Sequence, residues 1–151
     1  MDQKVNSICG ISLTPLRVIP TKGGDVMHCL KVTDHSFKGF GEAYFSTIDK
    51  DAIKAWKRHR EMTLNLVVPN GAVRFVIYDD RSNSSSKYLF QEVILSSENY
   101  MRLTIPPMVW VGFQGISNNR SYILNVADIA HNEDEIERKE LSNINFNWGK
   151  S

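Results

Sequence analysis

The sequence has little of what marks several large classes of protein. Only two of its 151 residues are cysteines, Cys9 and Cys29, and neither belongs to a C-x-x-C metal motif or to a disulfide framework. The polar N-terminus has no apolar signal core, and no run of about 18 apolar residues occurs anywhere. We therefore expect two reduced thiols in a cytoplasmic protein that does not enter a membrane.

A large net charge of either sign is also missing. The sequence contains 18 Lys and Arg residues against 17 Asp and Glu residues, which leaves a formal charge of +1. No overall electrostatic field would then recruit nucleic acid or a membrane surface. An anionic partner has to be small and has to meet a local cluster of cations.

The remaining composition is typical of a folded domain. Hydrophobic residues make up 42% of the chain and charged residues 23%, both close to ordinary globular values. The length suits a single domain over residues 1–151, since domains most often contain about 100–150 residues. No internal repeat is evident, so we expect one core.

Short alternating or apolar segments, separated by turn residues, predict β-strands along most of the chain. The first is interrupted by Pro15 and Pro20, which suits an edge strand. The predicted strands cover 8–19, 26–32, 42–48, 63–68, 72–78, 88–95, 101–105, 109–113 and 121–127, with a further one after a turn near 49–56. The acidic stretch 132–140 is the one plausible helix. This pattern predicts an all-β fold, a jelly roll or small barrel, with one short C-terminal helix.

A turn of sequence Pro69-Asn70-Gly71 separates two of these strands. Two apolar runs on either side of such a turn are a strong signal for a β-hairpin. We therefore expect the strands over 63–68 and 72–78 to pair with each other.

The stretch 55–61, which reads A-W-K-R-H-R-E, places one histidine among three cations and a carboxylate. An imidazole titrates near working pH, so His59 is the histidine best suited to act as a general base. The surrounding cations would attract a phosphate. We interpret this stretch as the part of a small β-barrel that carries the chemistry and binds an anionic ligand.

Residues 95–106 read L-S-S-E-N-Y-M-R-L-T-I-P and are followed by Gly112-Phe113. In this order they resemble the dTDP-4-dehydrorhamnose 3,5-epimerase family, which has L-S-x-E-N-x-x-x-L-x-I-P and then H-G-F. His59 lies where that family has R-G-x-H, and residues 145–148 are similar to its closing x-I-x-W. The likeness covers most of the chain from about Ile8 onward.

The resemblance implies a cupin-type jelly roll that epimerises a dTDP-linked 4-keto-6-deoxy sugar in deoxysugar and surface polysaccharide biosynthesis. The ketone makes the neighbouring hydrogen acidic, so no metal or organic cofactor is expected. A metal cupin would need H-x-H with a later Glu and His, whereas positions 59–61 give only H-x-E. The resemblance also implies a homodimer in which an N-terminal strand crosses to the partner, with Lys22 as the nearest cation to the family's crossing arginine.

A second likeness leaves the reaction open. Residues 106–110, residues 132–136 and the pair Asp79-Asp80 are similar to segments of the sugar 3,4-ketoisomerases, which share the barrel and carry H-A-H-K. Lys57 stands at the first of those histidines and His59 at the second. Both families act on dTDP-linked 4-keto-6-deoxy sugars. The alternatives to an epimerase are therefore a dTDP-sugar 3,4-ketoisomerase and a sugar-nucleotide-binding cupin without catalysis.

The resemblance implies that His59 is the base. The acid and the carboxylate that assist the base in the family have no counterpart at the matching positions. The family's tyrosine falls on Leu124, and the carboxylate that pairs with its histidine falls near Leu141 or Ser142. Tyr122 lies two residues before Leu124, hence on the same strand face, and is the predicted acid. The carboxylates predicted to orient His59 are Glu140 and Asp128.

Cationic side chains are the candidates for holding the diphosphate, because guanidinium groups bind phosphate through paired hydrogen bonds. On a regular strand Arg58 and Arg60 share one face and His59 the other, so at most one set faces the pocket. Lys57 is expected to join His59 only through a turn or a bulge. The predicted substrate-binding residues are Lys22, Lys57, Arg58, Arg60, Asn65, Arg74, Arg102 and Trp110, the last as a surface for stacking the base.

Overall fold

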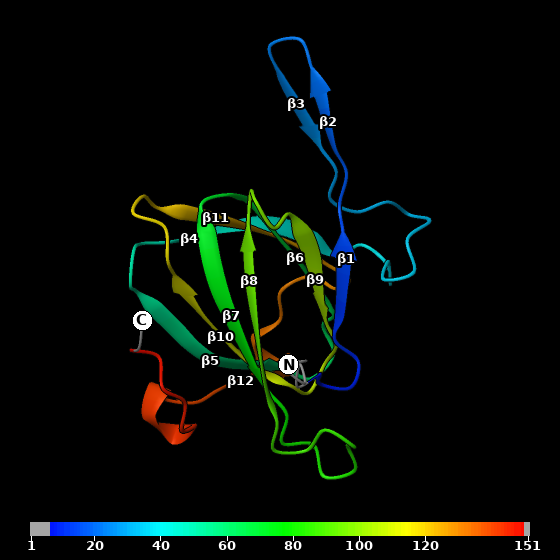
Figure 1. The fold of residues 1–151 in the computed structure, drawn as a ribbon. Coiled ribbons are helices and arrows are strands. Elements are labelled where there is room, and N and C mark those ends of the chain that lie inside the picture. The colour runs from blue at the N-terminus through cyan, green and yellow to red at the C-terminus, as the bar shows by residue number, and fades with distance from the viewer. Residues whose placement is uncertain (1–6, 150–151) are drawn as a thin grey trace, which may run out of the picture.

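The computed structural model describes residues 7–149 as two antiparallel β-sheets that face each other, with a projecting hairpin (Figure 1). The first sheet has the strand order β1-β9-β6-β11-β4 and the second β12-β5-β10-β7-β8. The strands of the first sheet are β1 (Ser12–Pro15), β4 (Glu42–Ile48), β6 (Leu64–Asn70), β9 (Met101–Ile105) and β11 (Ser121–Ala127). Those of the second are β5 (Ile53–His59), β7 (Ala72–Tyr78), β8 (Phe90–Ser96), β10 (Trp110–Gly115) and β12 (Ile136–Arg138).

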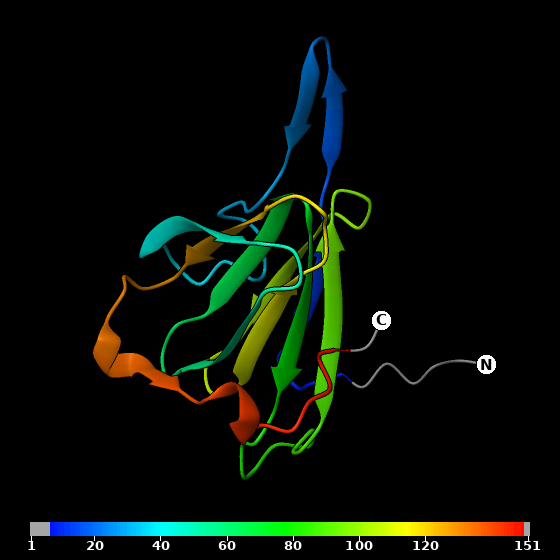
Figure 2. The same ribbon diagram turned by 90° about the vertical axis from the view of Figure 1, so that its left-hand side faces the viewer.

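Alternation along the strands builds the main core between the two sheets. Figure 2 shows the ribbon of these sheets after a turn of 90°. β6 turns Leu66 and Val68 inward, and β7 turns Phe75 and Ile77 inward to the same core. Burying one such side chain stabilises the fold by about 1.5–3 kcal/mol. The predicted all-β jelly roll is confirmed, and the bounds of β4, β7, β9 and β11 agree with the predicted ones.

The predicted hairpin around Gly71 is wrong. β6 pairs with β9 and β11, whereas β7 pairs with β8 and β10, so these consecutive strands lie in different sheets. Gly71 has a φ of 93°, and a Cβ added there would lie 2.2 Å from Oγ of Ser121. The turn residues therefore make a tight crossing between the sheets, which local sequence cannot distinguish from a hairpin turn.

The acidic stretch predicted as a helix has a different structure. The 3₁₀-helix η1 (Glu133–Glu135) passes directly into β12, and a second 3₁₀-helix, η2 (Leu141–Asn143), follows. A short stretch is marginal as an isolated helix, whereas pairing with the edge of β5 satisfies its backbone groups as a strand. None of the helices in the described part of the chain is long and apolar enough to cross a membrane.

A separate hairpin of β2 (Val18–Thr21) and β3 (Gly24–Met27) extends away from both sheets (Figures 1 and 2). Its side chains are largely exposed, including those of Val18 and Val26. The strand predicted over 26–32 therefore ends early, within this hairpin. The apolar hairpin contacts little of its own chain.

The C-terminal segment covers the outer face of the second sheet. Ile144 and Trp148 pack there with Trp56, Val76 and Trp110 in a second apolar cluster. This packing anchors the segment that follows β12, and β12 forms one wall of the cavity described below.

Candidate active site

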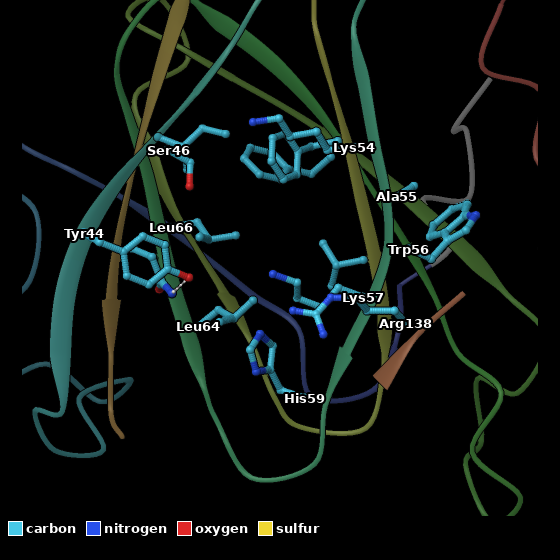
Figure 3. A pocket seen from close by; sticks show the side chains of 15 residues that line it. Tyr44, Ser46, Lys54, Ala55, Trp56, Lys57, His59, Leu64, Leu66 and Arg138 are labelled. Carbon is cyan, nitrogen blue, oxygen red and sulfur yellow. Dashed lines mark hydrogen bonds between the residues drawn. The ribbon is translucent and has the colours of Figure 1, made fainter. Parts of the chain in front are cut away.

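A cavity of about 430 Å³ opens between the two sheets (Figure 3). Inward-pointing residues of β4, β5 and β12 give it a polar side, and those of β6, β7 and β10 an apolar side. β11 contributes to both, with Asn125 and Ile123. The polar lining consists of Tyr44, Ser46, Lys54, Lys57, His59, Asn125 and Arg138. The apolar lining includes Leu64, Leu66, Phe75, Val111, Phe113 and Ile123.

Strand β5 contains an irregularity that brings an extra cation into the cavity. Against β10, Lys57 pairs with Val111 and Lys54 pairs with Phe113, so β5 has one residue more than its partner in this interval. Such a bulge shifts the phase of the side chains on the bulged strand. Lys54 therefore faces the cavity together with Lys57 and His59. Lys57 itself needs no bulge, contrary to our expectation, because it lies two residues before His59.

His59 forms a buried pair with Glu135. Nδ1 of His59 lies 2.5 Å from Oε1 of Glu135, and only 7% and 4% of the two residues are exposed. The second carboxylate oxygen of Glu135 accepts hydrogen bonds from the backbone N–H groups of Glu61 (3.1 Å) and Met62 (3.3 Å). These contacts fix the ring, which lines the cavity (Figure 3). Among residues 7–149, Nε2 of His59 has no hydrogen-bonding partner.

The charge of Glu135 follows from the same contacts. Burial alone would raise the pKa of Glu135, but the hydrogen bonds from His59 and from the two backbone N–H groups outweigh it and lower the pKa. The carboxylate is therefore ionised at neutral pH. An ionised carboxylate on Nδ1 stabilises the imidazolium that forms when Nε2 takes up a proton.

Tyr44 reaches the cavity from the opposite sheet (Figure 3). β4 places it directly across from Asn125 of β11, and Nδ2 of Asn125 donates to the Tyr44 hydroxyl oxygen at 3.0 Å. A phenol that accepts one hydrogen bond keeps its own proton available for donation. Tyr44 is therefore placed to act as a proton donor inside the cavity.

The cations of the cavity have unequal partners. The guanidinium of Arg138 holds both carboxylate oxygens of Glu133, at 2.8 and 3.1 Å. Nζ of Lys54 donates to the carbonyl oxygen of Thr47 at 2.9 Å. Burial of the ammonium, followed by repulsion from Arg138, lowers the pKa of Lys57.

The predicted acid, Tyr122, lies outside the cavity. Tyr122 and Leu124 share one face of β11, as expected, but that face points outward and 41% of Tyr122 is exposed. The residues of β11 that line the cavity are Ile123 and Asn125, on its other face. The tyrosine at the cavity is therefore Tyr44, which comes from β4.

The two carboxylates predicted to orient His59 are also elsewhere. Glu140 is exposed and immediately precedes η2. Asp128 accepts a hydrogen bond from the backbone N–H of Thr63 at 2.8 Å and so fixes the chain before β6. Glu135, five residues before Glu140, supplies the carboxylate.

Arg58 and Arg60 point away from the cavity, as strand alternation requires. Arg58 donates to Glu137 (2.5 Å) and to Asp80 (3.0 Å), and its guanidinium lies 4.6 Å from the ring centre of Trp110. Arg60 donates to the other oxygen of Glu137 at 3.0 Å. Trp110 is buried and donates to Asp80, so it lies in this outer network and does not line the cavity.

Arg74 and Arg102 hold other parts of the chain in place. Arg74 donates to the carbonyl oxygen of Trp148 and to Gln114, both at 2.6 Å, which fastens the C-terminal segment to the second sheet. Arg102 is 1% exposed and pairs with Asp34 at 3.1 Å on the outer face of the first sheet. Neither lines the cavity.

Asn65 and Lys22 complete the predicted binding residues. Asn65 donates to the carbonyl oxygen of Ser36 at 3.2 Å and accepts from Thr104 at 2.7 Å, again on the outer face of the first sheet. Lys22 lies in the turn of the β2–β3 hairpin, away from the cavity of its own chain.

Several polar residues of the site were not identified from the sequence: Tyr44, Ser46, Lys54, Asn125 and Arg138, which line the cavity, and Glu135, which pairs with His59. The alternation of β4 was visible, but nothing in it indicates which face meets the cavity. Glu135 lies within the acidic stretch 132–140, which the sequence predicts as a helix. Strand alternation could have indicated Arg138, because it places residues 137 and 138 on opposite faces. It gives no signal for Glu135, which lies in η1 and not in the strand.

Metal ligands do not gather here. Between residues 7 and 149, no three His, Cys, Asp or Glu side chains converge in a way that could hold a metal ion.

The crystal structure of a dTDP sugar isomerase from Desulfovibrio desulfuricans matches this fold with a TM-score of 0.91. The two chains are 38% identical, and the match covers 95% of this chain and 94% of the other. The chain belongs to the same family as this dTDP sugar isomerase, and it shares its fold with dTDP-4-dehydrorhamnose 3,5-epimerases. No protein-family model matches it.

Two further proteins are similar in sequence to this chain. The probable low-salt glycan biosynthesis epimerase Agl13 of Haloferax volcanii is 30% identical over 84 residues, which is 55% of this chain and 54% of that protein. That match thus spans about half the length of the relative. The spore coat polysaccharide biosynthesis protein SpsL of Bacillus subtilis is 24% identical over 145 residues, covering 93% of this chain and 96% of the other.

Proposed function

We propose that the protein is an epimerase that acts on a dTDP-linked 4-keto-6-deoxy sugar. His59 removes a hydrogen from the carbon next to the ketone, and Tyr44 returns a proton to the opposite face. The observation that carries this proposal is the buried His59–Glu135 pair, which opens on the same cavity as Tyr44. The family relationship and the cavity volume support the substrate class, since ligand pockets typically enclose about 300–1,000 Å³.

The base step uses the free nitrogen of His59. Nε2 takes the proton from the carbon, and the electron pair of that C–H bond moves through the adjacent carbon to the ketone oxygen, which becomes an enolate oxygen. Glu135 balances the positive charge that develops on the ring. A positioned base of this kind contributes roughly 10²–10⁴-fold to the rate.

The acid step uses Tyr44. Its hydroxyl gives a proton to the same carbon from the other side, and the ketone re-forms as the electron pair returns from oxygen. Asn125 donates to the resulting phenolate oxygen through the hydrogen bond already present. Proton exchange with solvent then restores both residues.

The two sides of the cavity suit the two parts of the substrate. Its apolar side, which includes Leu64 and Phe113, fits the methyl group of a 6-deoxy sugar. Lys54 and Arg138 offer cationic donors to the diphosphate. The four arginines proposed from sequence are not needed for this arrangement.

The proposal includes a cytoplasmic homodimer with one domain per chain. The exposed, apolar β2–β3 hairpin supports the dimer, because a two-stranded hairpin alone is at best marginally stable in water. It would carry Lys22 to the cavity of the partner subunit. The two free thiols, Cys9 and Cys29, are consistent with a reducing compartment. Sedimentation of the full chain is expected to give the dimer mass.

Incubation with dTDP-4-keto-6-deoxyglucose in deuterated buffer tests the function. We expect deuterium at C3 or C5 and a product with inverted configuration there, both visible by proton NMR. Binding of dTDP without any label uptake would leave a sugar-nucleotide-binding protein and overturn the proposed reaction.

A 3,4-ketoisomerase is the second candidate, and the position of Lys57 favours it. Lys57 adjoins His59 on the cavity face, so two titratable groups lie along one strand, where they can serve two adjacent carbons. The same incubation separates the reactions, because a ketoisomerase yields a 3-keto sugar whereas an epimerase retains the 4-keto group.

A further inference from the structure

Lys57 occupies an unusual position among the cavity cations. It lies two residues before His59 on the cavity face of β5, and its side chain points into the cavity beside Arg138 (Figure 3). Arg138 has Glu133 as its partner and Lys54 has the Thr47 carbonyl. Among residues 7–149, Lys57 has no hydrogen-bonding or ion-pairing partner for its ammonium.

The pairing of β12 with β5 brings a second cation, Arg138, next to Lys57, and attraction to Glu133 and Glu135 offsets their repulsion only in part. β12 pairs with β5 so that Arg138 lies directly opposite Lys57, and like charges at directly opposed strand positions are destabilising. Burial and this repulsion together lower the pKa of Lys57. An anionic oxygen near Nζ would relieve both effects.

We infer that Lys57 is a catalytic residue that donates a hydrogen bond to the enolate oxygen formed when His59 removes the proton. The inference rests on the proposed function and adds the group that stabilises its intermediate. Nζ of Lys57 and Nε2 of His59 project from neighbouring inward positions, as the ketone oxygen and the adjacent C–H group require. Lys57 keeps its protons, so no further reagent enters the reaction.

Lys54 provides the natural comparison. It is also a lysine of β5 that faces the cavity, but the bulge separates it from Lys57 and His59. Its ammonium is directed to the edge strand β4 by the Thr47 carbonyl. We therefore expect Lys54 to bind the diphosphate, whose charge is permanent, and Lys57 to stabilise the enolate oxygen, whose charge forms only during the reaction.

The two lysines can be separated by a pair of equal substitutions. Lys57→Met is expected to lower kcat and the rate of deuterium uptake about 10²-fold, as loss of an oxyanion donor does, with the Kd for dTDP unchanged. Lys54→Met is expected to raise the Kd for dTDP about tenfold, with a much smaller fall in kcat. Lys38→Met, an exposed loop substitution, controls for loss of a surface charge.

Lys57→Arg completes the experiment because it keeps a cationic donor and should recover part of the lost kcat. If Lys57→Met weakens dTDP binding and leaves kcat intact, Lys57 is a diphosphate ligand and the inference is overturned. If the wild-type protein binds dTDP but incorporates no deuterium, the proposed function itself fails, and the inference fails with it. If the wild type takes up deuterium and Lys57→Met keeps the wild-type kcat, the inference about Lys57 fails while the proposed function stands.

Discussion

Strand β5 carries cations on both of its faces, but the partners on the two faces differ. On the outer face, Arg58 contacts two carboxylates and an indole ring, and its charge is already satisfied by the fold. On the cavity face, Lys57 and Lys54 have no carboxylate within ion-pair distance among residues 7–149. Cations without a carboxylate partner in the fold thus mark the binding site. A cluster of charged residues in the sequence does not show which of its cations will have such a partner.

The largest effect on the cavity side is expected from the partner of the base. Glu135→Gln keeps the shape of the side chain but removes the charge that stabilises the protonated His59. We expect kcat to fall about 10³-fold while the Kd for dTDP stays the same. Steady-state kinetics and calorimetric titration measure the two. Glu140→Gln, which changes an exposed carboxylate nearby, is the matched control, and an equal loss in both variants would contradict the assignment.

A smaller loss is expected from the acid. Tyr44→Phe removes the hydroxyl and keeps the ring, so we expect the rate of product formation to fall about 10²-fold. Exchange of the hydrogen removed by His59 should fall less, because the base is intact. Comparing the NMR rates of deuterium uptake and of product formation checks this. Tyr122→Phe, on the outer face of β11, should match the wild type.

Substitutions on the outer face of β5 should change the free energy of unfolding. Arg58→Met removes charged hydrogen bonds to Glu137 and Asp80, so we expect the free energy of unfolding to fall by about 1–3 kcal/mol. Arg60→Met affects the same Glu137 from an exposed position and should cost under about 1 kcal/mol. Urea unfolding measures both. The contrast between the faces fails if Arg58→Met weakens dTDP binding without lowering stability.

The smallest effect is expected from acid titration of the buried pair. The pKa of Glu135 is lower in the folded protein than its ordinary value of 4.5. Its stabilising contribution is therefore complete above that pH and is lost as the pH falls through the folded-state pKa. Between pH 7 and pH 3, Glu135→Gln should lose less unfolding free energy than the wild type. Glu98→Gln, an exposed substitution, should lose as much as the wild type does.

The strands were largely predictable because alternation and turn residues are local. The bounds of β4, β7, β9 and β11 followed directly from the sequence. The pairing of β6 and β7 did not, because the turn at Gly71 has the same residues whether the chain folds back within one sheet or crosses to the other. That choice is made by partners distant in sequence, such as β9 and β10.

The candidate site was predictable only in part, for a related reason. His59 was identified from its own side chain and its neighbours in the sequence. Strand alternation correctly placed Arg58 on the opposite face of the strand. Glu135 comes from η1, 76 residues after His59, and Tyr44 comes from β4 in the opposite sheet. Lys54 enters the cavity through a bulge that the sequence does not mark. Site residues that lie on one strand can be predicted from the local sequence. A dyad or an acid–base pair that joins different segments can be predicted only when the order of the strands in the sheets is known.

The central claim is that the Nε2 atom of His59 removes the substrate hydrogen, and His59→Asn tests it most directly. The wild type and the variant are incubated with dTDP-4-keto-6-deoxyglucose in deuterated buffer, and dTDP binding is measured in parallel. We expect label next to the ketone with the wild type, no detectable label with the variant, and the same Kd for dTDP. Label uptake at the wild-type rate by His59→Asn would contradict the claim.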